Sequence, residues 1–372
     1  MHKVLKVKNG FKNYAALPYL CSRKKIIVLY NRINKDELKK RLMEEPIKRI
    51  TLSFYRYVII ENPADYRDAL YKTWDALNVK GRIYVAHEGI NAQLSVPEEH
   101  FEAFKTEVEK DKLLAGVPFK IAVEDDGKSF YKLMIKTRKK IVADGLKDDA
   151  FDVTNVGKHL SAKEFNEAMQ EDGTIVVDMR NHYESEVGRF ENAICPDVDT
   201  FREELDCVTE NLYDKKGMKL LLYCTGGIRC EKASAYFKHQ GYKDVNQLYG
   251  GIIDYARQIK QEGLESKFKG KNFVFDERLG EKITQDIISV CHQCGEACDE
   301  HTNCANDDCH LLFIQCDTCK EKMKNCCTPE CISIIGLPIE EQRQLRKGRI
   351  KNDSLSVYKS RLRPDLKKII HQ

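Results

Sequence analysis

The sequence lacks any apolar segment long enough to cross a lipid bilayer. Its uninterrupted apolar runs, such as Ile26 to Tyr30, are far shorter than the roughly 20 residues that a spanning helix needs. N-terminal lysines precede a short apolar stretch, but Pro18 interrupts it and no small-residue cleavage pattern follows. We therefore expect no membrane partner and no export signal, and we expect a cytoplasmic protein.

Several other signals are missing. The chain has no internal repeat, no low-complexity tract, no glycine motif for a dinucleotide and no convincing set of two histidines with a carboxylate. The last two absences leave no visible dinucleotide or non-haem iron site. Hydrophobic residues make up 42% and charged residues 32% of the 372 positions, which is typical of a globular chain with two or three domains.

Positive charge is concentrated at the two ends of the chain. The formal net charge is only +4, but residues 1–25 contain seven basic residues and no acid, and residues 341–372 contain ten basic and three acidic residues. Clustered lysine and arginine bind polyanions by releasing counterions, which suggests nucleic acid as a partner. Two solvated tails without a partner would give the same pattern.

Hydrophobic periodicity predicts a multidomain α/β protein. Strands at 51–60, 82–87, 91–96 and 131–137 and helices at 63–77 and 97–110 give the order βαββαβ of a ferredoxin-like domain. Further along, strands alternate with helices, which predicts a parallel sheet covered on both faces. We expect five segments: a basic N-terminal extension (1–45), a ferredoxin-like (acylphosphatase-like) α+β domain (46–148), a parallel-sheet α/β domain (155–268), a small cysteine-rich metal-binding segment (285–335) and a basic C-terminal tail (336–372).

A reactive cysteine is expected at the end of the apolar strand Leu220 to Tyr223. Cys224 follows this strand, and the loop continues as Thr225-Gly226-Gly227-Ile228-Arg229-Cys230 before a helix. Loops at the carboxyl ends of parallel strands bind ligands. Backbone N–H groups, the helix N-terminus and Arg229 would all stabilise a thiolate. The alternative is an inert cysteine in a tight turn.

Residues 159–260 resemble a rhodanese domain. The resemblance rests on Val177 to Arg180, Gly188 to Ala193, the Cys224 loop and Leu248 to Ile252. It implies a persulfide on Cys224, with Asp178 and Arg180 in supporting positions. Arg189 departs from the pattern, because rhodaneses often have histidine there.

The length of the Cys224 loop separates rhodaneses from the dual-specificity phosphatases of the cell cycle. Those phosphatases have their arginine six positions after the cysteine, whereas Arg229 is five positions after Cys224. The shorter loop suits sulfur better than phosphate. Cys230 either resolves a persulfide or sulfenate on Cys224 or is simply a small residue of the first helical turn.

Motifs in three segments together resemble the bacterial oxygen-dependent tRNA uridine hydroxylases. Besides the Cys224 loop, they are His87-Glu88-Gly89-Ile90-Asn91, Gly270 to Arg278, Cys291-His292-Gln293-Cys294 and Cys309 to Cys316. The resemblance covers nearly everything from Ile50 to Cys331. It implies an oxidoreductase for tRNA modification that hydroxylates the wobble uridine at C5, with O2 as co-substrate and an electron donor that the sequence does not identify.

Two other functions remain open at this point. A sulfurtransferase would pass persulfide sulfur from Cys224 to an acceptor. A zinc-stabilised RNA-binding adaptor would not need a reactive cysteine. The intact Cys224 and Arg229 argue against this function. The Glu88-Gly89 turn is either ordinary hairpin chemistry or, by the family resemblance, part of the active-site rim.

Ten of the 15 cysteines lie between positions 291 and 331, which predicts a metal site in a reducing compartment. Cys291-x2-Cys294 and Cys316-x2-Cys319 form two knuckles suited to a structural zinc ion. The residues that could form a second metal site are Cys298, His301, Cys304, Cys309, Cys326 and Cys327. Free thiols are the alternative.

Strand 131–138 offers a surface for RNA. With a period of two, Lys132, Lys136 and Arg138 share one face, while Leu133 and Ile135 share the other. Three positive charges on one strand face predict phosphate contacts, although an ordinary solvated face has the same composition.

Overall fold

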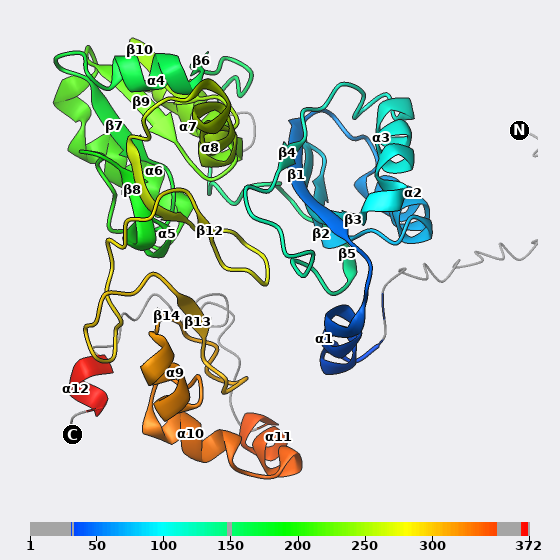
Figure 1. The fold of residues 1–372 in the computed structure, drawn as a ribbon. Helices are drawn as coiled ribbons and strands as arrows, with labels where there is room; N and C mark the ends of the chain where they lie inside the picture. The colour runs from blue at the N-terminus through cyan, green and yellow to red at the C-terminus, as the bar shows by residue number, and fades with distance from the viewer. Residues whose placement is uncertain (1–30, 32, 147–150, 348–365, 371–372) are drawn as a thin grey trace, which may run out of the picture.

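The computed structural model describes residues 31, 33–146, 151–347 and 366–370. Figure 1 shows two α/β domains side by side, with a smaller cysteine-rich part beneath them. The basic segment 1–25 and most of segment 341–372 lie outside the described residues, so the expectations for them stay untested. None of the described helices is long and apolar enough to cross a membrane.

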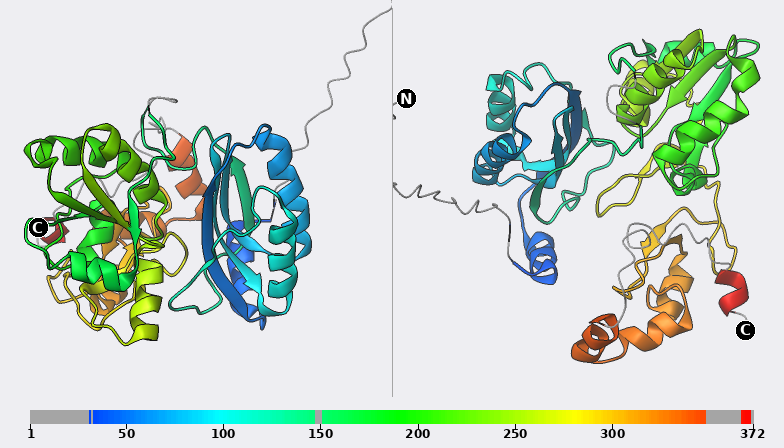
Figure 2. Two further views of the ribbon diagram at one scale, coloured as in Figure 1. Left: turned by 90° about the horizontal axis from the view of Figure 1, so that it is seen from above. Right: turned by 180° about the vertical axis from the view of Figure 1, so that it is seen from behind.

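The first domain is a five-stranded sheet with helices on one face. Its elements are α1 (Lys35–Glu44), β1 (Arg49–Tyr57), α2 (Pro63–Ala76), β2 (Lys80–Ala86), β3 (Gly89–Pro97), the 3-10 turn η1 (Glu98–His100), α3 (Phe101–Lys110), β4 (Lys120–Ile121) and β5 (Leu133–Thr137). The strand order is β4-β1-β3-β2-β5. Helices α2 and α3 cover the face turned away from the second domain (Figures 1 and 2).

Side-chain alternation decides which face of this sheet is free. Leu52, Phe54, Ile83 and Ile135 are buried in the core beneath the helices. Their strand neighbours, such as Tyr55, therefore point to the opposite face, toward the second domain. The ferredoxin-like fold class is confirmed, but its fourth strand is the short β4, which the sequence pattern missed. The predicted strand 131–137 is instead β5, an added edge strand that runs parallel to β2.

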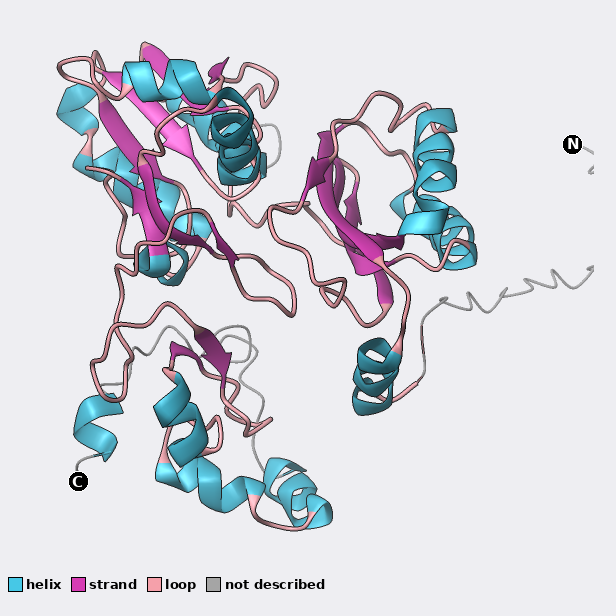
Figure 3. Cartoon of the chain, in the orientation of Figure 1, coloured by secondary structure: helices cyan, strands magenta, loops and turns pink. Residues whose placement is uncertain are grey.

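The second domain contains a four-stranded parallel sheet. Its elements are β6 (Lys158–Leu160), α4 (Ala162–Ala168), β7 (Ile175–Asp178), α5 (His182–Val187), β8 (Gly188–Phe190), α6 (Phe201–Asn211), η2 (Tyr213–Lys215), β9 (Lys219–Tyr223), α7 (Ile228–His239), β10 (Asp244–Leu248) and α8 (Gly251–Glu262). The strand order is β6-β10-β9-β7, and every pairing is parallel. β9 is therefore a central strand, and Figure 3 shows the strands of this domain in magenta with cyan helices around them.

Alternate residues of β9 enter two different cores. Leu220 and Leu222 pack with α6 and α7, whereas Leu221 and Tyr223 pack with α4 and α8. Burial on both faces explains why this strand reads as a continuous apolar run. The short elements α5 and β8 follow β7, in a segment where hydrophobic periodicity predicts no helix or strand. β8 pairs with β11 (Phe268–Asn272), which also pairs with β12 (Glu281–Lys282).

The third part is built around cysteines. It contains the pair β13 (His301–Asn303) and β14 (Leu312–Ile314), then α9 (Asp317–Met323), α10 (Pro329–Ile335), α11 (Ile339–Lys347) and α12 (Leu366–Ile370). Its buried cores consist mainly of cysteine side chains with a few apolar residues, such as Leu311 and Phe313. So small an apolar core needs a further source of stability.

Hydrogen bonds join the free face of the first sheet to the start of α7. The hydroxyl of Tyr57 donates to the carbonyl oxygen of Ile228 at 3.2 Å, and the hydroxyl of Tyr55 donates to Glu231 at 3.1 Å. The Cys224 loop therefore faces the first domain rather than open solvent.

Candidate active site

Cys224 lies at the carboxyl end of β9, where its thiol is enclosed by its own loop. The side chain is fully buried, and its Sγ accepts a hydrogen bond from the backbone N–H of Gly227 at 3.1 Å. Gly227 has φ of 95°, a left-handed conformation that suits glycine and turns the loop into α7. The strand, the turn and the helix start together fix the position of the sulfur.

The loop favours the thiolate form of Cys224. Burial by itself would raise the pKa of this thiol, but a hydrogen bond from the Cys230 thiol, the charge of Arg229 and the N–H groups of Cys230 and Arg229 outweigh it and lower the pKa to about 6. Burial and the neighbouring Cys224 have the opposite effect on Cys230, whose pKa is raised well above its ordinary value. Near neutral pH the pair therefore consists of a Cys224 thiolate and a Cys230 thiol that donates to it.

Arg229 is held by a carboxylate of α5. Its guanidinium donates to both oxygens of Glu184, at 2.6 and 2.8 Å, and Glu184 is fully buried. Thr225 also donates to Glu184 at 3.2 Å. This bidentate pair fixes the position of the guanidinium beside the loop.

Asp178 and Arg180 support the strand that carries Cys224. Arg180 donates to the two oxygens of Asp178 at 2.8 and 2.7 Å, and the hydroxyl of Tyr223 donates to Asp178 at 2.8 Å. All three side chains are fully buried. Their network holds Tyr223, the residue before Cys224, and neither charged residue lines the cavity described next.

A cavity of about 350 Å³ lies between the two domains at the Cys224 loop. One wall is the loop, with Cys224, Gly226 and Arg229, and the other is the free face of the first sheet. The aromatic and cationic residues among those that line it are Phe54, Tyr55, Tyr84, Phe130, Phe201, Phe275, Arg82, Lys120, Arg229 and Arg278. Aromatic rings with positive charges suit a nucleotide, because bases stack and phosphates attract cations.

Phe275 and Arg278 belong to the Gly270–Arg278 motif, so the structure brings this motif to the Cys224 loop. Glu88 lies nearby: its Oε2 accepts from Lys232 of α7 at 2.7 Å, and its Oε1 accepts from the backbone N–H of Ile141 at 2.7 Å. The Glu88-Gly89 turn thus ties the first domain to the helix that follows the Cys224 loop.

Lys136 of β5 lies on the sheet face that also bounds the cavity, and Lys132 and Arg138 flank this strand. Met134 is opposite Arg82, and Lys136 is opposite Tyr84, in the parallel pairing of β5 with β2. The guanidinium of Arg138, just after the strand, lies 5.3 Å from the ring centre of Tyr84. Lys136 and Arg138 are exposed, and Lys132 is half-buried. Lys136 and Arg138, which both lie next to Tyr84, therefore extend the cavity wall outward.

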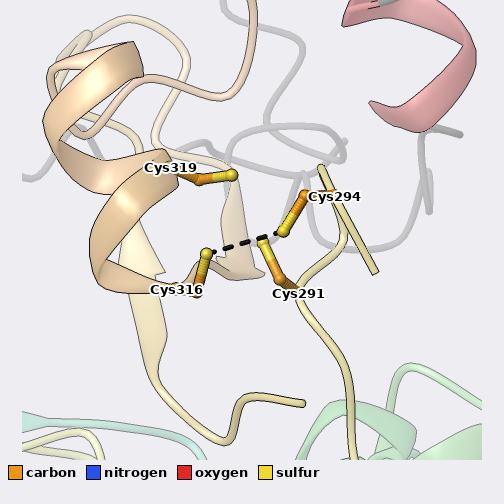
Figure 4. A group of neighbouring side chains, drawn as sticks. All are labelled: Cys291, Cys294, Cys316 and Cys319. Atoms are coloured by element: carbon orange, nitrogen blue, oxygen red, sulfur yellow. Dashed lines mark hydrogen bonds between the residues drawn. The ribbon is translucent and has the colours of Figure 1, made fainter. Parts of the chain in front are cut away.

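Two separate groups of four cysteines are positioned to hold metal ions. Cys291, Cys294, Cys316 and Cys319 form the first group, which Figure 4 shows. The Sγ atoms of each group lie within 4.8 Å of one another. The second group is Cys304, Cys309, Cys327 and Cys331. Four thiolates suit a tetrahedral zinc ion.

The second group differs from the set that the sequence suggested. Cys298, Cys326 and His301 do not belong to it, and Cys331 does. Cys326 and Cys327 are adjacent in the chain, and only Cys327 points its sulfur into the group.

Three residues of the site were not predicted from the sequence: Tyr55, Glu184 and Lys120. Tyr55 and Tyr57 alternate with core residues along β1, so two tyrosines on the free face of a strand were a usable signal. Glu184 forms a capping box with Asn181 at the start of α5. Lys120 carries no such signal, because the two-residue β4 is too short to recognise.

Comparison with known proteins agrees with this architecture. Family models match residues 49–141 as a UPF0176 acylphosphatase-like domain, 161–258 as a rhodanese-like domain and 269–332 as a rhodanese C-terminal segment. Fold and loop therefore define a multidomain rhodanese-type protein. Relatives that match most of the chain identify a more specific family within this class of protein. The chain is 59% identical to the tRNA uridine(34) hydroxylase of Leptospira interrogans over 92% of its own length and 93% of the relative.

Two further relatives carry the same name. The proteins of Escherichia fergusonii and Enterobacter sp. (strain 638) are 53% and 52% identical, over 87% and 91% of this chain and 92% and 97% of theirs. The chain belongs to the tRNA uridine(34) hydroxylase family. The family resemblance seen in the sequence is thereby confirmed.

Proposed function

We propose that this chain is an oxidoreductase that hydroxylates C5 of uridine 34 in tRNA, with O2 as co-substrate and Cys224 as the reacting thiolate. One observation carries the proposal. Cys224, with its lowered thiol pKa, opens onto a cavity shared by two domains, in a chain whose relatives are named for this reaction. Because the proposed substrate is tRNA, we also propose that the enzyme is cytoplasmic.

Uracil chemistry gives the thiolate a specific task. Addition of Sγ to C6 of the base makes C5 nucleophilic and moves negative charge onto the ring oxygen O4. Transfer of one oxygen atom of O2 to C5, with the other released as water, consumes two electrons from an external donor and two protons. Loss of the proton on C5 then expels Cys224 and restores the ring.

The cavity wall and β5 provide the binding surface for tRNA in this proposal. Tyr55, Tyr84 and Phe275 offer faces on which an unstacked base can rest. Lys132, Lys136 and Arg138 contact phosphates on either side of it. The basic termini add sequence-independent attraction for the rest of the tRNA.

Each cysteine group binds one structural zinc ion in our proposal. A site with four thiolates leaves no open position for substrate or water, so the ions stabilise the third part and take no part in the chemistry. The small apolar core of this part supports such a role.

Nucleoside mass spectrometry of tRNA from a deletion strain tests the proposed function. Loss of a uridine that is heavier by one oxygen atom, with recovery on complementation, is the expected result. Loss of a thiouridine instead would establish sulfur transfer from Cys224 and overturn the proposal.

A further inference from the structure

We propose that Lys120, from the first domain, donates a hydrogen bond to the uracil oxygen on which negative charge accumulates when the target base reacts at Cys224. This proposal rests on the proposed function and assigns one further catalytic residue to it.

Lys120 reaches across from the edge of the first sheet to the Cys224 loop. It lies on β4, opposite Ser53 of β1. A Cβ atom added to Gly226 would lie 3.8 Å from the Cδ of Lys120, so the lysine stem packs against the loop. Its Nζ lies 4.3 Å from the ring centre of Tyr55, and only 4% of the residue is exposed. The ammonium is therefore held against the Cys224 loop, in the cavity that Cys224 also lines.

The charge of Lys120 differs from those of Arg229 and Arg278 because, among the described residues, no carboxylate forms a direct ion pair with it. Arg229 is paired with Glu184, and Arg278 is paired with Asp276 and Glu281. Within the described part of the chain, no ion pair or hydrogen bond of the Lys120 ammonium is present, and Tyr55 provides its cation–π contact. An enclosed ammonium without a directly contacting counter-ion is costly, and an anionic group on the substrate would offset that cost.

Electrostatic surroundings agree with this role. Burial lowers the pKa of Lys120, and the more distant charges of Asp254, Cys224 and Glu231 partly offset that effect. When Cys224 adds to the base, the thiolate charge passes to the uracil oxygen. A fixed ammonium that already favours the charge on sulfur continues to stabilise it after this transfer, with little reorganisation.

A uracil oxygen is a better partner for Lys120 than a phosphate oxygen. Lys120 is enclosed between Tyr55 and Gly226, in the same cavity that Cys224 lines. Exposed cations outside the cavity, Lys136 and Arg138, are available to phosphates. A base contact acts on the chemical step, whereas a phosphate contact acts on binding, so kinetics separates the two.

The test compares Lys120→Met, which keeps the length of the side chain, with Lys120→Arg, which keeps the charge. Lys105→Met is the matched control, because Lys105 lies on α3 and is partly exposed. Each full-length variant is first checked by circular dichroism. The measurements are kcat and KM for tRNA, the Kd for tRNA at several salt concentrations, and the rate at which iodoacetamide alkylates Cys224 as a function of pH.

For Lys120→Met we expect kcat to fall by about 100-fold, the typical effect of losing one donor to a developing oxyanion, with little change in KM or Kd. The alkylation profile should move to higher pH, because one positive charge near the sulfur is gone. Lys120→Arg should recover much of the rate, and Lys105→Met should match the wild type.

Other results overturn the proposal in distinguishable ways. A Lys120→Met variant with unchanged kcat but higher KM and a weaker salt dependence would assign Lys120 to a phosphate. Full activity with unchanged binding would show that the lysine is dispensable. A wild-type protein that makes no hydroxyuridine would overturn the proposed function itself, and this proposal with it.

Discussion

Lys232 of α7 and Glu88 of the first domain form an ion pair of 2.7 Å that joins the two domains beside the Cys224 loop. The same ammonium lies 2.5 Å from Asp144, and both Lys232 and Asp144 are only 2% exposed. One buried lysine thus holds two carboxylates that precede the second domain in the chain. This connection, together with the hydrogen bonds of Tyr55 and Tyr57, joins the two domains whose walls form the cavity.

Replacing Lys232 by methionine should destabilise the protein and reduce activity. Removing one partner leaves Asp144 buried with only Lys140 as a cation, and we expect a loss of about 3 kcal/mol in the free energy of unfolding. Urea denaturation measures this loss, with Lys163→Met on α4 as the control. Equal stability of the two variants would contradict the structural role of the pair.

The ion pair of Lys232 with Asp144 should also make the free energy of unfolding depend on pH. Burial raises the pKa of Asp144, but hydrogen bonds from Lys232 and Lys140 outweigh it, so the net pKa lies below its ordinary value. A depressed carboxyl pKa stabilises the fold above the unfolded-state value and loses that effect as the pH falls through the folded-state value. The difference in stability between wild type and Lys232→Met should therefore shrink on acidification.

Cys230 should control the ionisation of Cys224. Since the Cys230 thiol donates to Cys224, Cys230→Ala removes a hydrogen bond that lowers the pKa of Cys224, whereas Cys230→Ser keeps a donor. Alkylation of wild-type Cys224 should rise with pH around 6, and the profile of the alanine variant should move upward. Identical profiles for the alanine and serine variants would show that the hydrogen bond is unimportant. A role of Cys230 in resolving a persulfide would instead abolish turnover in both.

Elemental analysis should find two zinc ions per chain. Cys331→Ser should lose one of them, because Cys331 belongs to the second cysteine group, and Cys298→Ser should keep both. Removal of zinc should unfold the third part while the parallel sheet around β9 persists. Protein purified without chelator that contains no metal would contradict this expectation.

Affinity for tRNA should fall steeply with salt. Neutralising one phosphate contact should reduce the slope of log Kd against log salt by about one. We therefore expect a smaller slope for Lys136→Ala and Arg138→Ala, with sequence preference unchanged. A truncation after Glu340 tests the basic tail separately. Unchanged binding in all three variants would rule out this electrostatic surface.

Local patterns predicted the parts of the site that lie close together in sequence. The apolar run of β9, the glycines after it and Arg229 predicted the thiolate environment of Cys224, because these residues determine it locally. The same holds for the two Cys-x2-Cys knuckles, whose spacing sets the geometry of a metal site.

Contacts between distant segments could not be predicted in this way. The partner of Arg229 is Glu184, which lies 45 positions earlier in the chain on the short helix α5. Lys120 lies on a strand of two residues, and its position beside Gly226 follows from the packing of two domains. The edge position of β5 depends on its pairing with β2, which hydrophobic periodicity does not specify.

Above all, we propose that Cys224 enables this chain to transfer an oxygen atom from O2 to uridine 34. Its most direct test incubates the purified full-length protein with unmodified tRNA, a reductant and isotopically labelled O2, followed by nucleoside mass spectrometry. We predict a uridine that carries one labelled oxygen with the wild type and with the control Cys207→Ser, and no such product with a folded Cys224→Ser. An unlabelled hydroxyuridine, or full product formation by the serine variant, would contradict the account.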